Sequence, residues 1–182
     1  MKSGARMEIR IGGTGGQGLI LSAKMLADAL AGAGKRVAQS QTYEPTSRGG
    51  FCNSDLVVSD SEVDYPLATA LDCLVLLDRM AVKPSWPLLK LGALVIADTR
   101  LCPEVPENGH RCHHMPLTRT AIELGSERVA NIVALGALAA LGKLCDRKTL
   151  EAAVRAETPK AYLDLNMDAL AAGYKMAASP EP

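Results

Sequence analysis

Aromatic side chains are scarce in this sequence, which has one Trp, one Phe and four Tyr among 182 residues. Proteins that bind single-stranded nucleic acid stack the bases on aromatic side chains, so this kind of binding is not expected. An excess of one charge is also missing, because 20 Lys and Arg balance 20 Asp and Glu. Without a basic stripe or patch, neither nucleic acid nor an anionic membrane surface is an expected partner.

Long apolar runs and paired cysteines are missing as well. No run reaches the length of about 20 residues that a membrane-spanning helix needs, and the basic stretch Met1 to Arg6 is not followed by the apolar core of a signal peptide. The cysteines number five and include no C-x-x-C pair, which favours reduced thiols and a cytoplasmic location. The same spacing argues against an iron–sulfur cluster held by this chain alone.

What the sequence does contain is a regular alternation of apolar strand-like and helix-like segments. With 182 residues and 48% apolar content, the chain is large enough for one domain with a buried core. The alternation predicts an α/β fold with a mostly parallel sheet flanked by helices. We expect strands at 8–11, 36–42, 51–59, 71–77, 93–98 and 111–116, and helices at 19–31, 84–90, 118–124, 127–144, 146–156 and 160–177. Residues 1–7 are expected to form a flexible extension and 178–182 a flexible tail, so that the domain spans 8–177.

The glycine-rich stretch from Gly12 to Gly18 joins the first strand to the first helix. Free N–H groups at a helix N-terminus bind anions, and glycine lets a ligand approach the backbone closely. Its G-x-G-x-x-G spacing alone is a weak sign of a nicotinamide site, which also needs a carboxylate about 20 residues later, at the tip of the second strand. Here the first carboxylate, Glu44, lies beyond that tip, and no Gly-Lys-Ser/Thr follows as in a P-loop. A purely structural strand-to-helix joint is the alternative.

The segment from Tyr43 to Gly50 is predicted to be a loop leaving the second strand. Arg48, beside a pair of glycines, suits an anion or partner contact, with a solvated turn as the alternative. Because the carboxyl ends of the strands meet at one edge, this loop, the glycine loop and 98–100 should converge. Asn131 lies in an apolar helix, where a buried amide needs partners: either the glycine loop or a ligand.

The remaining candidates for chemistry are predicted to be structural, and no catalytic residue is assigned. His113 and His114 are adjacent, so in a strand they would face opposite sides, and no metal site is expected around them. Cys52 is predicted to be a small buried thiol rather than a reactive one. The carboxylates flanking the apolar strands are expected to be turn or cap residues, namely Asp72, Asp78 and Asp98.

Several motifs occur along the chain in an order that resembles that of a known protein family. The motifs are Gly13 to Gly18, Gln39 to Tyr43 running into Arg48-Gly49-Gly50, Val57 to Asp60, Asp64 to Pro66, Ala130 to Gly136 and Asn166 to Gly173. Together they resemble the gamma subunit of 2-oxoacid:ferredoxin oxidoreductases over about residues 8 to 176, closest to the 2-oxoglutarate type, with the pyruvate, branched-chain ketoisovalerate and indolepyruvate types as neighbours. The departures are Glu44 and Thr46, where the family usually has Gly and Glu, and the atypical Cys52-Asn53.

The resemblance implies a Rossmann-like domain that is inactive alone and works inside a multi-subunit enzyme. The expected partners are an alpha and a beta subunit, with a ferredoxin-like delta and ferredoxin itself. Thiamine diphosphate, magnesium and the iron–sulfur clusters would belong to those partners, and the isolated chain is expected to dimerise. Coenzyme A is the ligand this chain would share, through Gly13, Thr14, Gly15, Gly16, Gln17, Gly18, Arg48, Gly49 and Asn131. The alternatives are a stand-alone nucleotide- or coenzyme-binding protein and an interaction scaffold with an empty loop.

Overall fold

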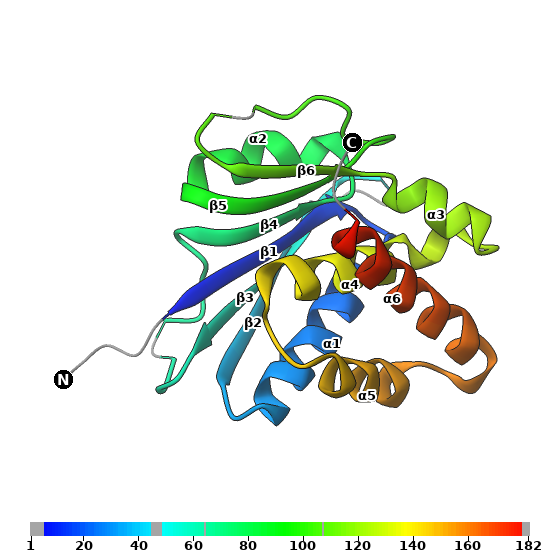
Figure 1. Ribbon diagram of the computed structural model, residues 1–182. Coiled ribbons are helices and arrows are strands. Elements are labelled where there is room, and N and C mark those ends of the chain that lie inside the picture. The colour runs from blue at the N-terminus through cyan, green and yellow to red at the C-terminus, as the bar shows by residue number, and fades with distance from the viewer. Residues whose placement is uncertain (1–5, 45–48, 64, 107, 180–182) are drawn as a thin grey trace.

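One sheet of six strands forms the centre of the protein (Figure 1), in the order β2-β3-β1-β4-β5-β6. The computed structural model describes residues 6–44, 49–63, 65–106 and 108–179. The strands are β1 (Met7–Thr14), β2 (Arg36–Tyr43), β3 (Phe51–Ser59), β4 (Leu71–Leu76), β5 (Leu89–Asp98) and β6 (Arg111–Met115). Strands β1, β4, β5 and β6 are parallel, and β3 runs antiparallel to both β1 and β2. The predicted mostly parallel α/β sheet is confirmed.

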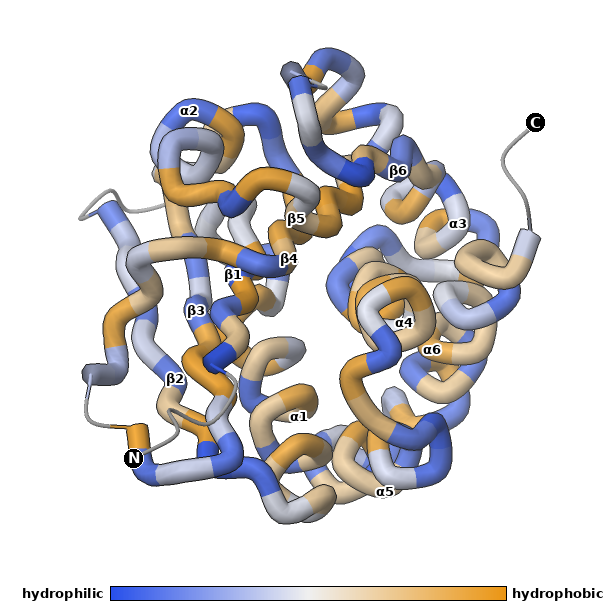
Figure 2. The backbone as a smooth tube through the Cα atoms, turned by 60° about the vertical axis from the view of Figure 1, so that its left-hand side comes forward, coloured by the Kyte–Doolittle hydropathy of each residue, from blue (hydrophilic) through white to orange (hydrophobic). Residues whose placement is uncertain are grey.

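The longer helices lie together on one face of this sheet (Figures 1 and 2), and the short α2 lies on the other. The α-helices are α1 (Leu19–Gly32), α2 (Val82–Ser85), α3 (Leu117–Glu123), α4 (Ala130–Gly142), α5 (Arg147–Glu157) and α6 (Leu163–Ala178). Helix α4 contacts β4 and β5 on one side and α6 on the other. Its residues 130–139 are all buried, as expected of a helix that is apolar on every side.

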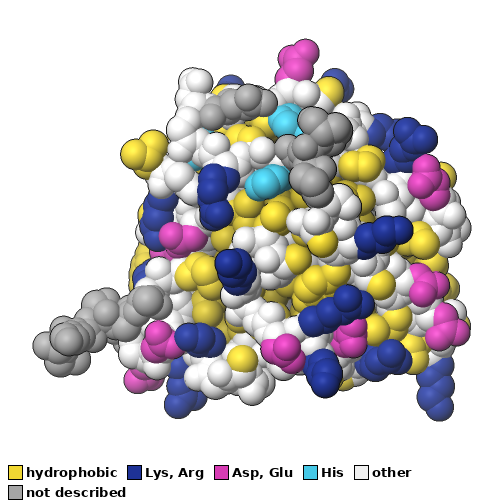
Figure 3. All heavy atoms as spheres, viewed as in Figure 1, with side chains coloured by type: hydrophobic (Ala, Val, Ile, Leu, Met, Phe, Trp, Pro, Cys, Tyr) yellow, Lys and Arg dark blue, Asp and Glu magenta, His cyan; other side chains and the backbone are white. Residues whose placement is uncertain are grey.

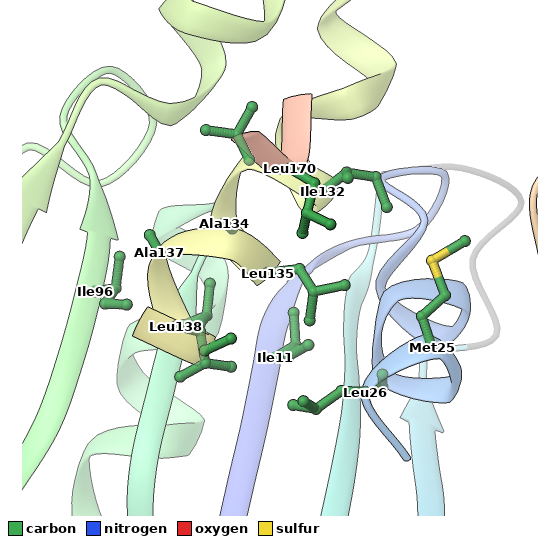
Figure 4. Close-up of a cluster of buried hydrophobic side chains, with 14 of the residues drawn as sticks. Ile11, Met25, Leu26, Ile96, Ile132, Ala134, Leu135, Ala137, Leu138 and Leu170 are labelled. Carbon is green, nitrogen blue, oxygen red and sulfur yellow. The ribbon is translucent and has the colours of Figure 1, made fainter. Parts of the chain in front are cut away.

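The main core fills the space between the sheet and the helices. In Figure 4, Ile11 of β1 and Ile96 of β5 point toward Leu135 and Leu138 of α4, and Leu26 of α1 closes the group. A smaller apolar cluster packs on the opposite face, around β4, β5 and α2. Because both faces of β4 and β5 are covered, their sequences are nearly continuous apolar runs.

Charged side chains replace apolar ones on that opposite face of β1. Arg10 is almost fully buried, and two of its guanidinium nitrogens, Nε and Nη2, each donate to a different carboxylate oxygen of Asp55 at 2.7 Å. Asn53 donates a further hydrogen bond of 2.8 Å to Asp55. A buried charge is tolerable only when it is paired in this way. On the side of the molecule that Figure 3 shows, which is the side seen in Figure 1, basic and acidic side chains are mixed, with hydrophobic side chains between them.

Several predicted boundaries differ from the observed ones. Strand β1 continues through Gly12 and Gly13, because it is paired with β3 up to Thr14. The helix predicted at 84–90 is confirmed only in part: three short helical turns, α2 among them, occupy 79–88, and β5 begins at Leu89. The helix expected at 127–144 begins with a 3-10 turn and ends at Gly142, where Lys143 takes a left-handed conformation with φ 48°. Residues 1–5 and 180–182 lie outside the described part of the chain.

Candidate functional site

The loops that leave β1 and β2 meet at the carboxyl edge of the sheet. The N–H of Gly15 donates to the carbonyl of Gly50 at 3.1 Å, which ties the glycine loop to the far end of the second loop. The predicted convergence of these two loops is therefore confirmed. Gly49 has φ 76°, a left-handed conformation that favours glycine. Arg48 lies outside the described residues.

The glycine loop is open to solvent at its tip. Gly15 and Gly16 are exposed, and no heavy atom lies within 4 Å of the place where either would carry a side chain. Gly18, the N-cap residue that precedes α1, has φ 72° and provides no capping side chain. The first N–H groups of α1 are thus not used by a side-chain cap, which leaves them suited to an anion.

Gln17 has an internal role that the sequence did not reveal. Its side-chain oxygen accepts from the N–H of Thr14 at 2.8 Å, and its side-chain nitrogen donates to the carbonyl of Leu77 at 2.9 Å. The side chain therefore joins the end of β1 to the end of β4. A side chain at Gly13 would overlap this amide, so Gly13 is required for packing, and only the backbone of Gln17 is left for a ligand.

Asn131 braces the start of α1. Its side-chain nitrogen donates to the carbonyl of Gly18 at 2.9 Å, and a Cβ on Gly18 would lie 2.5 Å from that nitrogen. The predicted alternative of a bond to the glycine loop is thus confirmed. The residue is only 4% exposed, and its side-chain oxygen has no donor among the described residues. A buried acceptor of this kind needs a donor from water or from a ligand.

A hollow of about 200 Å³ lies beside the glycine loop. Its lining combines the loop with the turn that leads into α4, and consists of Gly16, Gln17, Leu77, Thr118, Glu127, Arg128 and Ala130. Glu127 is 3.6 Å from Arg100. Arg128, in contrast, has no carboxylate within 4.0 Å in the described part of the chain. Sequence reasoning missed Arg128 because only the fold brings it to the loop.

The predicted turn and cap roles are confirmed for Asp78 and Asp98, whereas Asp72 lies within β4 and forms an ion pair instead. Asp98 is fully buried and accepts from the N–H groups of Arg100, Leu101 and Thr118. Asp78 caps a short turn by accepting from the N–H of Met80 at 2.9 Å. Asp72 pairs with Lys90 at 2.7 Å.

The thiols and imidazoles show no arrangement suited to catalysis. Cys52 is buried as predicted, and burial raises the pKa of its thiol. Burial likewise raises the pKa of Cys102 to about 12, which keeps that thiol protonated and unreactive. His113 and His114 belong to β6, the strand at the sheet edge. Within the described ranges, no three His, Cys, Asp or Glu side chains are grouped closely enough to hold a metal ion.

Among the residues that the structure describes, no helix has both the length and the apolar character needed to span a membrane.

Comparisons with known proteins all lead to one family. The family model described as pyruvate ferredoxin/flavodoxin oxidoreductase matches residues 8–176. The 2-oxoglutarate synthase subunit KorC of Methanocaldococcus jannaschii is 36% identical over 176 residues, 94% of each chain. The gamma subunit of a keto/oxoacid ferredoxin oxidoreductase from Geobacter sulfurreducens has a TM-score of 0.87 and 37% identity, over 95% of this chain and 97% of that one.

A longer relative has also been solved with ligands. The 2-oxoglutarate:ferredoxin oxidoreductase of Magnetococcus marinus, with 2-oxoglutarate, coenzyme A and succinyl-CoA bound, matches with a TM-score of 0.84 and 26% identity. The match covers 97% of this chain but only 31% of the relative's chain. The fold described above thus forms one part of a longer polypeptide in that protein.

Proposed function

This chain belongs to the pyruvate ferredoxin/flavodoxin oxidoreductase family, and we propose that it is the gamma-type subunit of an enzyme that oxidatively decarboxylates 2-oxoglutarate. The enzyme would release succinyl-CoA and pass the electrons to ferredoxin. The observation that carries this proposal is the match, over 94% of both chains, to a subunit named 2-oxoglutarate synthase. The Magnetococcus relative, named for the same oxoacid, supports it.

The partners would be an alpha and a beta subunit, with a ferredoxin-like delta. In the Magnetococcus relative the region that matches this chain makes up 31% of one polypeptide, which supports a domain that works packed against others. We expect the assembled enzyme in the cytoplasm, since no pair of the chain's cysteines forms a disulfide and thiols of this kind are typical of that compartment.

The redox cofactors would reside on the partners. An iron–sulfur cluster needs a set of cysteine ligands close together, and the described residues of this chain do not fit one, because Cys52, Cys73 and Cys102 are separately buried. Thiamine diphosphate and magnesium are assigned to the partners for the same kind of reason, as no diphosphate–magnesium motif occurs in the sequence.

Coenzyme A is the ligand to which this chain's own residues fit. The exposed amides of Gly15 and Gly16, followed by the uncapped start of α1, suit the phosphates of the coenzyme. The neighbouring Gly18 and Gly49 have left-handed conformations, and we propose that Arg48 also contacts these phosphates. The role of the chain would be to bind and orient the coenzyme at the subunit boundary, while the chemistry supplied by thiamine takes place on the partners.

The test is to purify the chain from its native source with its partners and to assay the complex. We expect thiamine-binding subunits to copurify, and 2-oxoglutarate with coenzyme A to reduce viologen and form succinyl-CoA detectable by mass spectrometry. Faster turnover of pyruvate, ketoisovalerate or indolepyruvate would contradict the substrate proposal. Recovery of a single inactive chain that binds coenzyme A would instead support a stand-alone coenzyme-binding protein.

A further inference from the structure

We propose that the outer edge of β2 binds β2 of a second copy of this chain in antiparallel orientation, which joins the two sheets across a two-fold axis between the two Ser40 residues. Strand β2 lies at the end of the sheet (Figure 1), with β3 on its inner side and no other described strand beyond it. This lateral edge is distinct from the glycine loop. The inference goes beyond the proposed function and does not depend on the 2-oxoglutarate assignment.

Strand β2 has none of the features that protect an edge strand from pairing. Such protection usually comes from lysine, proline, a bulge or a short length. This strand has eight residues without lysine or proline, and its register with β3 is unbroken. Five of its eight side chains are exposed. The strand at the opposite edge, β6, has only five residues. The edge of β2 is therefore a template on which another strand can pair.

The outward backbone groups of β2 belong to its odd-numbered residues. The N–H of Glu44 donates to the carbonyl of Phe51 on β3 at 3.0 Å, and the carbonyl of Ser40 accepts from the hydroxyl of Ser54 at 3.4 Å. Residues 40 and 44 thus direct their backbone groups toward β3. Since this direction alternates along an antiparallel strand, the groups that point away from β3 are those of Val37, Gln39, Gln41 and Tyr43.

The side chains select one register for the second copy. Arg36 and Glu44 lie on the same face of β2, because side chains an even number of residues apart share a face. When the two Ser40 residues face each other, Arg36 of each chain lies opposite Glu44 of the other. Val37 then lies opposite Tyr43, a β-branched and aromatic pair of the kind that stabilises antiparallel strands. A shift by two residues in either direction would separate the opposite charges.

The two charges are available for this contact. Arg36 and Glu44 are exposed, and neither forms an ion pair within the described part of the chain. Two carboxylates line the same hollow as Arg36, but Asp60 is paired with Lys35 and Glu62 is exposed. Because an exposed ion pair adds little affinity, the charges would set the register, and the backbone hydrogen bonds would hold the strands together.

Cross-linking of the full-length chain tests the register directly. Facing residues that are not hydrogen-bonded to each other have Cα atoms about 4.5 Å apart, within the range of a disulfide. We expect Ser40→Cys to form a covalent dimer with oxidised glutathione, seen on a non-reducing gel. The matched control is Thr42→Cys on the same face. Its two copies would lie about 13 Å apart along the strands, too far for a disulfide, so this variant should stay at the background of the wild type, which carries the same five native cysteines.

Exchanging the charges tests the contact between Arg36 and Glu44 without any oxidant. Light scattering of the wild-type chain should give the mass of a dimer. Glu44→Arg places arginines opposite each other at both ends of the pairing, and we expect the dimer dissociation constant to rise by about tenfold. Combining it with Arg36→Glu should restore the constant to within about threefold of wild type. Glu104→Arg, at an exposed position in the loop before β6, makes the same change of charge and should have no effect.

The proposal is overturned if the wild-type chain is a monomer, or if Ser40→Cys cross-links no faster than Thr42→Cys. It is also overturned if the double exchange of charges dissociates as readily as Glu44→Arg alone. A cross-link with the expected register would stand whichever oxoacid the assembled enzyme consumes, so this result and the test of the proposed function can fail separately.

Discussion

At the residue scale, Glu8 shows how a single buried carboxylate joins two distant parts of the chain. It is 3% exposed and lies on β1. Its side chain accepts from the N–H groups of Thr69 at 2.5 Å and Ala70 at 2.6 Å, and from Arg6 at 2.8 Å. Burial alone would raise the pKa of this carboxyl, but the hydrogen bonds from Ala70, Arg6 and Thr69 outweigh burial and lower the pKa below its usual value.

This lowered pKa predicts a pH-dependent contribution to stability. Since the folded-state pKa of Glu8 lies below the unfolded value of about 4.3, its contribution is fully present above that pH and is lost as the pH falls through the folded-state pKa. We expect Glu8→Gln to lower the free energy of unfolding by about 1–3 kcal/mol at pH 7, and the difference from wild type to shrink below about pH 4. Urea denaturation at a series of pH values measures this difference.

The control is Glu62→Gln, at an exposed position, whose free energy of unfolding should stay within about 0.5 kcal/mol of wild type at every pH. A loss of stability in Glu8→Gln that does not change with pH would show that the charge of Glu8 is not the cause.

The glycine loop shows what single residues reveal in a sequence. The spacing of Gly13, Gly15 and Gly18 predicted a tight joint at a helix start, because only glycine suits such backbone. The spacing could not show why each glycine is needed, because the side chains that exclude a Cβ come from other parts of the chain. Gly13 makes room for the side chain of Gln17, which is hydrogen-bonded to Leu77, and Gly18 makes room for the side chain of Asn131. Arg128 escaped prediction for the same reason.

At the scale of elements, the apolar runs were the most informative signal. Both faces of β4 and β5 are covered, and the nearly continuous apolar sequences of these strands predicted that they are buried. The segment 79–88 misled because Pro84 and Pro87 suit the first turn of a helix, whereas here they fall in a succession of short turns. The antiparallel β3 was also not predictable in direction, since a buried strand reads the same either way.

The crossing of α4 and α6 depends on two glycines that face each other, Gly136 and Gly173. A methyl group at residue 173 would overlap the carbonyl of Val133 and lie 2.9 Å from the nitrogen of Ala137. Both obstacles are backbone atoms, which cannot rotate away. The two helices could admit a side chain only by moving apart, and α4 would then also shift against the sheet.

We therefore expect Gly173→Ala to destabilise the protein even though alanine is the better helix former. The loss of unfolding free energy should be about 1–3 kcal/mol, a fall of a few degrees in Tm by circular dichroism. Gly32→Ala near the end of α1 is the matched control, because its nearest neighbour would be Thr149 at 3.9 Å; it should be neutral or stabilising by up to about 1 kcal/mol. Equal behaviour of the two variants would mean that the helices are not packed as closely as described.

At the scale of the whole molecule, the carboxyl edge of the sheet is the face that combines the open loops with exposed apolar side chains. Ile20 and Leu21 of α1 are 40% and 39% exposed, and Tyr43 at the end of β2 is 66% exposed. All three adjoin the glycine loop or the second loop. Large apolar side chains beside a ligand site are typical of a protein interface, and a coenzyme bound there would lie between this chain and its partner.

Leu21→Glu tests whether this edge faces the partner subunits. The side chain is partly exposed, so the isolated variant should fold with a free energy of unfolding close to that of wild type. Burying the new carboxylate in an interface without a partner is costly, and we expect affinity for the partner subunits to fall by about tenfold or more, measured by size-exclusion chromatography of the reconstituted complex. Leu91→Glu is the control, because Leu91 is 88% exposed near the amino end of β5.

If the isolated chain dimerises through the same edge, light scattering should show Leu21→Glu shifted toward monomer. Assembly of both variants as in wild type would place the partner on another face and leave the glycine loop open to solvent in the complex.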